Sequence, residues 1–581
     1  MNVKRIGIGL VLALVVLLSL GVYAHVDDGE GAGAFEYMEV YMSPLTGAEE
    51  ARSLGLNSVD EDWGLWGHNL RRVLPHRPAE SVFAWHDGER DEEQFCFSSD
   101  TLLGYIADYI EENFGRQPQQ RFAILPNDNG TVCLCRKCRD RGNRAGDASP
   151  AAFYMLERLA LRFPEHVFFT SDYLTTRKLP RQRLPGNTGV LVSAMDYGLF
   201  ACRRREAGEE RFRNTLRQWG AVTGNVYVWD YICNFDDYLT PFPVFTAMQR
   251  RLRLYADAGV KGVFLNGSGT DYSSLQAVKG RVLAAMLKSP DAEWADFLGE
   301  TCRARYPNVG GMIADFLLEQ EEWTARHGHK LPLYGGVRDA LGSFLPEEKF
   351  IRFHDALGTK LPELSGHERT EVASLWHGLA FTRLELMRLQ GRTEGAEEML
   401  RRLELLENEG VMAYNEAGWS IRDYVEDYRY MLNHAAETGA TNVLRGERLL
   451  ALSALDEDYT DTGLLTDGLL GLPSNYHCGH LISSVSGELR LQLPKRAGGL
   501  RRLRVYVSSN PRFRIQWPEY VGLSVGGREL ARGVPVDVGR GHAVVNFELP
   551  AGVEGDVVLT CVRKSGARQM ALEEVEGFEN Q

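Results

Sequence analysis

Residues 121–138 read RFAILPNDNGTVCLCRKC, and they combine a strand signal, an acidic turn and three thiols. The apolar run 122–125 is short, and Pro126 with the Asn and Gly residues after it ends the run in a turn. We therefore predict a buried strand with the carboxylate of Asp128 at its carboxyl end. In a (β/α) barrel this end of the strands carries the active site.

Strand-like and helix-like segments alternate on both sides of this stretch, from residue 35 to residue 305. The expected strands are 35–41, 122–125, 166–170, 189–193, 225–229 and 261–265. The expected helices are 100–114, 150–163, 206–223, 243–258 and 271–288. This alternation predicts an α/β fold in which helices wrap a parallel sheet. Because the repeat is long and no glycine-rich dinucleotide fingerprint follows the first strand, we expect a TIM-type (β/α)8 barrel rather than an open sheet.

Two further regions follow the expected barrel, and a short one precedes it. Residues 306–440 are rich in Leu, Glu, Arg and Ala at helical spacing, which predicts an all-helical domain. Residues 443–581 contain short β-type runs separated by turns, which predict a β-sandwich. Basic residues precede the apolar run 6–22, which indicates a signal peptide over 1–24, followed by a flexible leader over 25–34.

Charge and the N-terminal segment limit the partners and the location. The formal net charge is -14, and nucleic acid is not expected as a partner because phosphate binding needs a basic face. The signal peptide predicts export to the periplasm or the extracellular space. The alternative is that residues 6–22 stay uncleaved as an anchor, since the run is almost long enough to span a bilayer. A membrane partner is expected only in that case.

Polar and aromatic side chains gather where the predicted strands end. They are Asn127, Asp128, Asp172, Tyr173, Asp196, Tyr197, Asp230, Tyr231 and Asn266. Each single Asp is equally explained as the cap of the next helix, but capping does not account for the aromatic residues beside them. Aromatic faces stack on sugar rings, and two carboxyl groups supply the acid and the base or nucleophile of glycosidic cleavage. The set therefore predicts a carbohydrate site.

Several segments between residues 60 and 305 carry a family resemblance. They are Trp63-Gly-Leu-Trp-Gly-His68, Leu74-Pro75, Asp87-Gly-Glu-Arg90, Phe95-Cys-Phe97, the run from Pro126 to Cys138, and Val228-Trp-Asp-Tyr231. Together they resemble domain-of-unknown-function family 4838, a glycosidase-like barrel of exported bacterial proteins that is distantly similar to the α-glucuronidases. The resemblance puts Asp128 in the place of the strand-tip acid, where a Glu is usual.

On this basis Asp128 is the expected general acid and Asp230 the expected base or nucleophile. The expected substrate-binding residues are Trp66, His68, Asn127, Asp172, Tyr173, Asp196, Tyr197, Tyr231, Asn266 and Asp271.

The thiols of residues 133–138 are expected to have a structural role. With a fourth thiol, Cys133, Cys135 and Cys138 would make a four-sulfur zinc site, and the family resemblance points to Cys96 as the fourth ligand. The alternative is two disulfides, Cys96–Cys133 and Cys135–Cys138, which export favours. Either way the expected role is scaffolding, because a closed tetrahedral site has no open position for a substrate.

The C-terminal region adds a second resemblance. Leu465-Thr-Asp-Gly468 and the segment from Ala571 to Glu576 resemble the galactose-binding-like (discoidin-type) β-sandwich, which is common as a carbohydrate-binding module. We therefore expect an exported glycoside hydrolase that cleaves O-glycosidic bonds of a poly- or oligosaccharide by carboxylate acid/base catalysis, with no cofactor for catalysis. The alternative is a non-catalytic carbohydrate-binding protein whose barrel lacks a working carboxylate pair.

Overall fold

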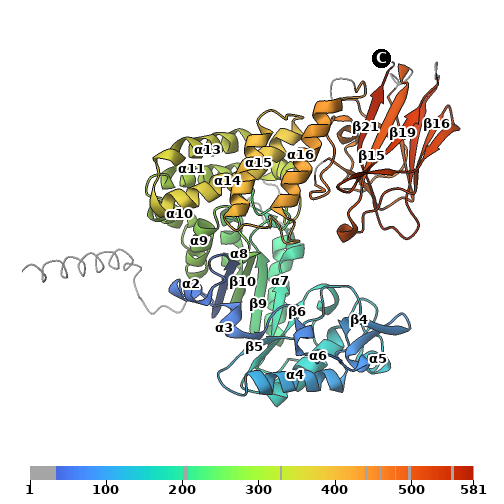
Figure 1. Cartoon of the computed structure of the whole chain (residues 1–581). Coiled ribbons are helices and arrows are strands. Elements are labelled where there is room, and N and C mark those ends of the chain that lie inside the picture. Colours follow the sequence, from blue (N-terminus) through green and yellow to red (C-terminus); the bar gives the residue numbers. More distant parts are fainter. Residues whose placement is uncertain are drawn as a thin grey trace, which may run out of the picture.

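The structure is a computed structural model, and it describes residues 34–200, 207–327, 330–438, 442–457, 459–477, 479–494, 499–550 and 555–579 (Figure 1). The expected signal peptide, and all of the expected leader except Ala34, lie outside these residues. Within the described ranges, no helix has both the length and the apolar character needed to cross a membrane.

A seven-stranded parallel sheet forms the centre of the first region. Its strand order is β1-β10-β9-β7-β6-β5-β2. The strands are β1 (Tyr37–Met42), β2 (Trp63–Leu65), β5 (Arg121–Ala123), β6 (Val167–Asp172), β7 (Thr188–Ser193), β9 (Asn225–Tyr231) and β10 (Gly262–Gly269). All six predicted strands are present. Strand β2 was not predicted because three residues are too few to show a period-2 pattern.

The sheet curls around a core of its own. One face of the strands contributes a cluster of buried side chains, namely Tyr37, Trp63, Ala123, Leu125, Phe169, Leu191, Tyr227 and Phe264. Successive side chains of a strand point to opposite faces, so residues of the other parity, such as Val226 and Val228, pack in the larger core with the helices. Tyr37 lies in β1 and Trp63 in β2, the strands at the two ends of the sheet, and their rings pack edge to face with centroids 5.9 Å apart.

The two end strands, β1 and β2, are not hydrogen-bonded to each other. The backbone of Met38 instead exchanges two hydrogen bonds with Asn57, of 2.9 and 2.8 Å. The amide of Val59 donates to the Glu39 carboxyl group at 3.0 Å. The free edge of β1 is therefore already occupied by the segment that leads into helix α3 (Val59–Asp62). The expected closed (β/α)8 barrel is not confirmed, because the described residues form a curled sheet of seven strands that is open at this point.

Helices surround the sheet and then form a layer of their own. Those of the first region are α2 (Ala48–Ser53), α3, α4 (Asp100–Asn113), α5 (Arg136–Arg141), α6 (Ser149–Arg162), α7 (Ala207–Val222), α8 (Phe245–Asp257) and α9 (Gln276–Lys288). Those that follow are α10 (Trp294–Arg305), α11 (Gly310–His327), α12 (Val337–Ser343), α13 (Glu347–Lys360), α14 (Gly366–Leu389), α15 (Ala396–Asn408) and α16 (Ile421–Thr438). Figure 1 shows α10–α16, in yellow to orange, on the opposite side of the sheet from α4 and α6.

Small strand pairs connect these layers. The hairpin of β3 (Phe83–His86) and β4 (Glu89–Phe95) projects beside α5 and α6. Strand β8 (Leu199–Phe200), after β7, pairs antiparallel with β11 (Lys330–Leu331) of the helical region. The helical region is therefore attached directly to the loops at the carboxyl ends of the central strands.

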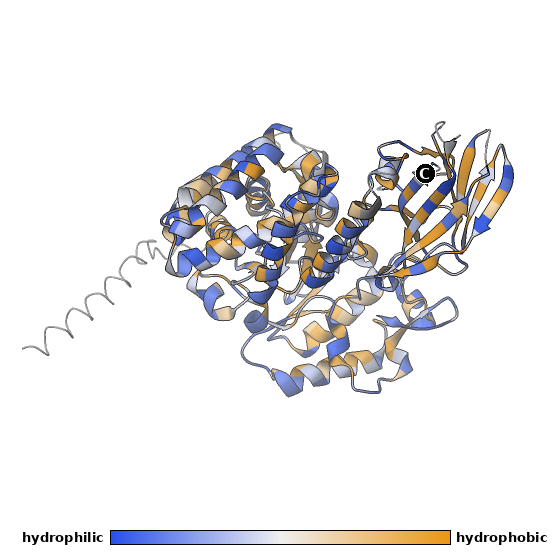
Figure 2. Ribbon diagram, turned by 45° about the horizontal axis from the view of Figure 1, so that its top comes forward, coloured by the Kyte–Doolittle hydropathy of each residue, from blue (hydrophilic) through white to orange (hydrophobic). Residues whose placement is uncertain are grey.

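The chain ends in two five-stranded antiparallel sheets. Their orders are β12-β14-β20-β16-β17 and β13-β21-β15-β19-β18. The strands are β12 (Leu450–Ala451), β13 (Leu481–Ser483), β14 (Glu488–Gln492), β15 (Arg502–Ser508), β16 (Tyr520–Val525), β17 (Arg528–Gly533), β18 (Val536–Gly539), β19 (His542–Glu548), β20 (Val557–Val562) and β21 (Met570–Phe578). Figure 2 shows hydrophobic and hydrophilic bands alternating along these strands. The alternation buries one side chain in two between the sheets.

Candidate functional site

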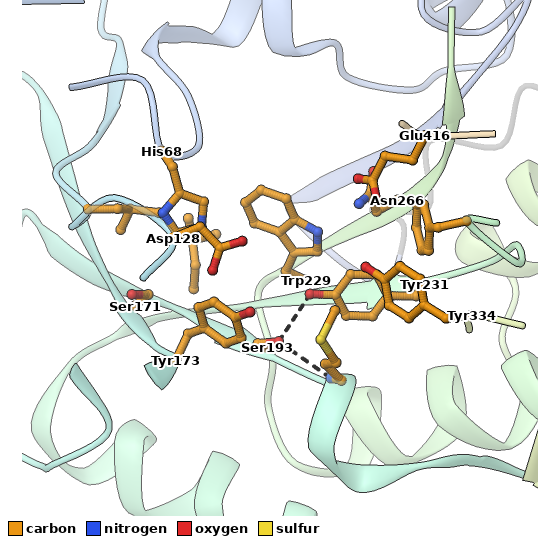
Figure 3. A pocket seen from close by; sticks show the side chains of 14 residues that line it. His68, Asp128, Ser171, Tyr173, Ser193, Trp229, Tyr231, Asn266, Tyr334 and Glu416 are labelled. Carbon is orange, nitrogen blue, oxygen red and sulfur yellow. Dashed lines mark hydrogen bonds between the residues drawn. The ribbon is translucent and has the colours of Figure 1, made fainter. Parts of the chain in front are cut away.

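A cavity of about 160 Å³ lies at the carboxyl ends of the central strands (Figure 3). Its lining side chains come from the ends of six strands, β2, β5, β6, β7, β9 and β10, and from the helical region. They are His68, Leu125, Asp128, Ser171, Tyr173, Leu191, Ser193, Met195, Trp229, Tyr231, Phe235, Asn266, Tyr334 and Glu416. Of the predicted site residues, the structure brings Asp128, His68, Tyr173, Tyr231 and Asn266 together here.

The turn that carries Asp128 is fixed from both sides by strand β4. The Gln94 side chain is 2% exposed, accepts a hydrogen bond from the Asn127 amide at 3.0 Å, and donates to Asn127 O and Asn129 Oδ1 at 3.1 and 3.0 Å. The side-chain amides of Asn127 and Asn129 both donate to the carbonyl of Glu93, at 2.8 and 2.9 Å. Asp128 is therefore an exposed carboxylate on an immobilised turn.

Two neighbours define the environment of Asp128. His68 Nδ1 lies 2.6 Å from the carbonyl of Pro126, so Nδ1 carries the proton and donates. Burial, together with the adjacent Asp128 carboxylate that interacts with the hydroxyl, raises the pKa of Tyr173 to about 12. Tyr173 therefore stays a neutral hydroxyl that can donate a hydrogen bond. Figure 3 shows His68, Asp128 and Tyr173 on the left side of the cavity.

The floor of the cavity is aromatic. The Trp229 ring, which lines the cavity, stacks on the ring of Trp66 outside it with centroids 4.8 Å apart, and the hydroxyls of Ser193 and Tyr231 are 3.1 Å apart. The indole Nε1 of Trp229 is buried and has no hydrogen-bond partner among the described residues. Buried donors are nearly always paired in folded proteins. A ligand oxygen in this cavity would supply the missing acceptor.

The helical region supplies the opposite wall, which sequence analysis missed. Tyr334 follows β11, and Glu416 lies in the loop between α15 and α16. Both segments are tied to the loop after β9, because Phe235 N donates to Leu333 O and Glu416 N donates to Phe235 O, each at 2.8 Å. Asp236 adds an ion pair to His477 at 3.0 Å and accepts from the Gly335 amide at 2.9 Å.

Glu416 has a perturbed carboxyl group. Partial desolvation raises its pKa above the ordinary value, and the negative charges of Asp236 and Asp128 raise it further, while a hydrogen bond from Tyr334 opposes the rise. Solvent still reaches the side chain. The cavity therefore contains two carboxyl groups in different environments, of which Glu416 holds its proton to a higher pH than an ordinary glutamate.

Asp230, the expected partner of Asp128, does not line the cavity. It is 2% exposed on the other face of β9, where its carboxylate accepts from Tyr255 at 2.5 Å and lies 3.5 Å from Arg251 Nη1. The reason is strand parity: Asp230 points the same way as Val226 and Val228, whereas Trp229 and Tyr231 point to the cavity. The structure thus gives Asp230 a place in a buried ion pair.

Other expected substrate-binding residues also lie outside this cavity. Asp172 accepts from the Trp219 indole at 2.6 Å, and Asp196 pairs with Arg177. The ring of Tyr197 stacks on that of Phe212 with centroids 4.1 Å apart. Asp271 lies in the loop after β10 and does not line the cavity.

A second cavity adjoins the first at His68. It has a volume of about 710 Å³, and it opens where β1 and β2 fail to pair. Trp66 and Asn127, two of the expected binding residues, line it together with Tyr41, Asp60 and the basic side chains of Arg71 and Arg72. The larger cavity is therefore bordered by both end strands of the open sheet.

Comparison with known proteins gives one family match. The model of a family described as "Domain of unknown function (DUF4838)" matches residues 66–317. No curated protein was found to match the chain.

Three of the solved structures that match the chain are only weakly similar to it. The lectin domain of Lectinolysin complexed with Lewis B antigen is 20% identical and covers 24% of this chain and 97% of its own, with a TM-score of 0.19. A Streptococcus pneumoniae fucose binding module, SpX-3, is 14% identical and covers 24% and 99%, with a TM-score of 0.19. SpGH29 is 11% identical and covers 87% and 94%, with a TM-score of 0.18. TM-scores this low do not establish a shared fold, and a specific likeness to α-glucuronidases is not confirmed.

Proposed function

We propose that this chain hydrolyses an O-glycosidic bond, with Glu416 as the general acid and Asp128 as the base or nucleophile. The observation that carries the proposal is the placement of these two carboxyl groups, from separate regions of the chain, in one aromatic cavity. Glycosidic cleavage needs two such groups in different protonation states. The raised pKa of Glu416 suits the proton donor, because a general acid must hold its proton at the working pH.

This assignment changes the expected roles. Asp230 is replaced by Glu416, because the Asp230 carboxylate is held in the pair with Arg251. Asp128 changes from acid to base or nucleophile, because the raised pKa of Glu416 suits that group to the role of the acid.

The cavities support a carbohydrate as the substrate. The small cavity, at about 160 Å³, is below the roughly 300–1,000 Å³ of pockets for drug-sized ligands, so it suits one terminal sugar unit. Trp229 offers an aromatic face and an unpaired N–H, and Asn266 and Tyr173 offer polar groups for hydroxyls. The rest of the saccharide would extend past His68 into the larger cavity.

The test is hydrolysis by the purified full-length chain of a panel of 4-nitrophenyl glycosides and of a panel of polysaccharides, read as released nitrophenol and reducing ends. On the active substrate, Asp128→Asn and Glu416→Gln should each lower kcat/KM by about 10²–10⁴-fold. The matched controls are Asp140→Asn and Glu394→Gln, which change exposed carboxylates outside the cavity.

The leaving group separates the two roles. A 2,4-dinitrophenyl glycoside needs no protonation to depart, so Glu416→Gln should cost much less on it than on a 4-nitrophenyl glycoside, while Asp128→Asn should cost the same on both. Full activity in both variants would overturn the assignment. Sugar binding by the wild-type chain without any release of product would support the non-catalytic alternative instead.

A further inference from the structure

Four thiols that the proposed reaction does not use lie beside the Asp128 turn. Cys96 follows β4, Cys133 and Cys135 follow the turn, and Cys138 belongs to α5. The four sulfur atoms all lie within 4.8 Å of one another. Cys96, Cys133 and Cys138 are at most 3% exposed, and Cys135 is half-buried.

The spacing of the sulfur atoms matches a metal tetrahedron. Zinc–thiolate bonds are about 2.3 Å long, so two sulfurs of a tetrahedral Zn(Cys)4 site are about 3.8 Å apart. Cys96 Sγ lies 3.7 Å from Cys135 Sγ and 3.7 Å from Cys138 Sγ. A disulfide joins one sulfur to one partner at about 2.05 Å, whereas Cys96 is equally distant from two. We propose that Cys96, Cys133, Cys135 and Cys138 bind one structural Zn²⁺ ion.

Groups around the cluster suit thiolate ligands. The backbone N–H of Trp85 donates to Cys133 Sγ at 3.2 Å, and Leu134 N–H returns a bond to Trp85 O at 2.8 Å. Ser98 Oγ lies 3.2 Å from Cys138 Sγ and accepts from Arg141 Nε at 3.1 Å, which leaves the Ser98 hydroxyl proton for the sulfur. Hydrogen bonds of this kind orient the thiolate ligands and stabilise their negative charge.

The ion would join two segments that are far apart in the sequence. One is the β3–β4 hairpin, which Cys96 directly follows, and the other is the segment from Asp128 to Cys138. Gln94, two residues before Cys96, is the side chain that holds the Asp128 turn. The zinc site therefore fixes the strand against which Asp128 is positioned. It goes beyond the proposed hydrolysis, and metal content and thiol state are measured without reference to any activity.

The experiment is elemental analysis of the full-length protein, purified without chelator from zinc-supplemented medium. We expect about one zinc per chain, and X-ray absorption at the zinc edge should show four sulfur neighbours at about 2.3 Å. Cys96→Ser and, in case that buried variant does not fold, the half-buried Cys135→Ser should lose zinc at least tenfold faster to a competing chelator. The control is Cys302→Ala, which removes a buried thiol outside the cluster and should keep one zinc.

A second measurement tests the bracing role. Removal of zinc by chelator should raise amide hydrogen exchange in residues 83–96 and 126–138 and leave the two C-terminal sheets unchanged. Less than 0.1 zinc per chain, together with a mass 4 Da below that of the reduced chain, would show two disulfides and overturn the proposal. Bound iron in place of zinc, or unchanged exchange after zinc removal, would equally contradict it.

Discussion

Glu39 is a buried carboxyl group whose ionisation the fold opposes. It is 1% exposed at the open edge of β1, where Tyr37 and the Val59 amide hydrogen-bond to it. Burial raises its pKa from 4.5 to about 8, and the two hydrogen bonds only partly oppose the rise. Glu39 is therefore protonated in the folded chain at pH 7 and ionised in the unfolded chain. We predict that Glu39→Gln makes the protein more stable at and above neutral pH.

The size of the effect follows from linkage. Because the folded pKa exceeds the unfolded one, the stabilisation is complete below pH 4.5 and is lost as pH rises towards 8. Each pKa unit corresponds to about 1.4 kcal/mol, so the total loss is about 5 kcal/mol. A glutamine keeps an acceptor for Val59 and an N–H donor for Tyr37, but it has no proton to lose. The variant should equal the wild type near pH 4.5 and exceed it by about 5 kcal/mol at pH 8.

The assay is urea unfolding from pH 4.5 to 8, followed by tryptophan fluorescence and far-UV circular dichroism, and analysed for the transition in which both signals change together. The control is Glu80→Gln, which makes the same chemical change at an exposed position. The difference in unfolding free energy between variant and wild type should grow by about 1.4 kcal/mol per pH unit. A difference that stays constant with pH, or a variant that is less stable at pH 8, would mean that Glu39 is ionised in the fold and that the reasoning is wrong.

Two further predictions concern two other buried titratable groups, His354 and Asp230. Burial lowers the pKa of His354 to about 4 against the opposing pull of Asp355, so its contribution is present above pH 6.5 and is lost as pH falls towards 4. The unfolding free energy of the wild type should fall between pH 7 and pH 4, and His354→Gln should reduce that fall by about 3 kcal/mol, as measured by urea unfolding at the two pH values. Asp230→Asn leaves the Arg251 charge unpaired and should lower the unfolding free energy by about 3 kcal/mol, with kcat of the folded fraction unchanged. A loss of kcat without a loss of stability would mean that Asp230 takes part in catalysis, as the sequence predicted.

The first region could be predicted from sequence because its strands are buried on both faces. Runs such as Val226-Tyr-Val-Trp in β9 are continuously apolar, as parallel strands packed between two layers are expected to be. The same property leaves the orientation of each side chain unpredicted, because a continuously apolar run does not show which residues face the inside of the sheet. Asp230 was placed in the site because it ends a strand, yet its parity puts it against Arg251. Counting in twos from Trp229 would have separated the faces once one inward residue was known.

The open edge of the sheet could not be predicted for a different reason. At this edge Asn57 pairs with the Met38 backbone through its side-chain oxygen and its own amide, and Glu39 accepts from the Val59 amide. Asn57 lies outside the predicted strands, and β2 is three residues long. Residues of both end strands, β1 and β2, line the larger cavity.

Glu416 could not be predicted as a site residue, because it lies outside the part of the chain that carries the sequence motifs. The family match ends at residue 317, so the matched region contains Asp128 but neither Tyr334 nor Glu416. Those two side chains reach the cavity through hydrogen bonds from the loop after β9 to segments that follow α11 and α15. The strand ends therefore supply one carboxylate and the aromatic floor, and the helical region supplies the second carboxyl group. Because the two come from separate layers, the contact between the layers creates the pair on which hydrolysis would depend.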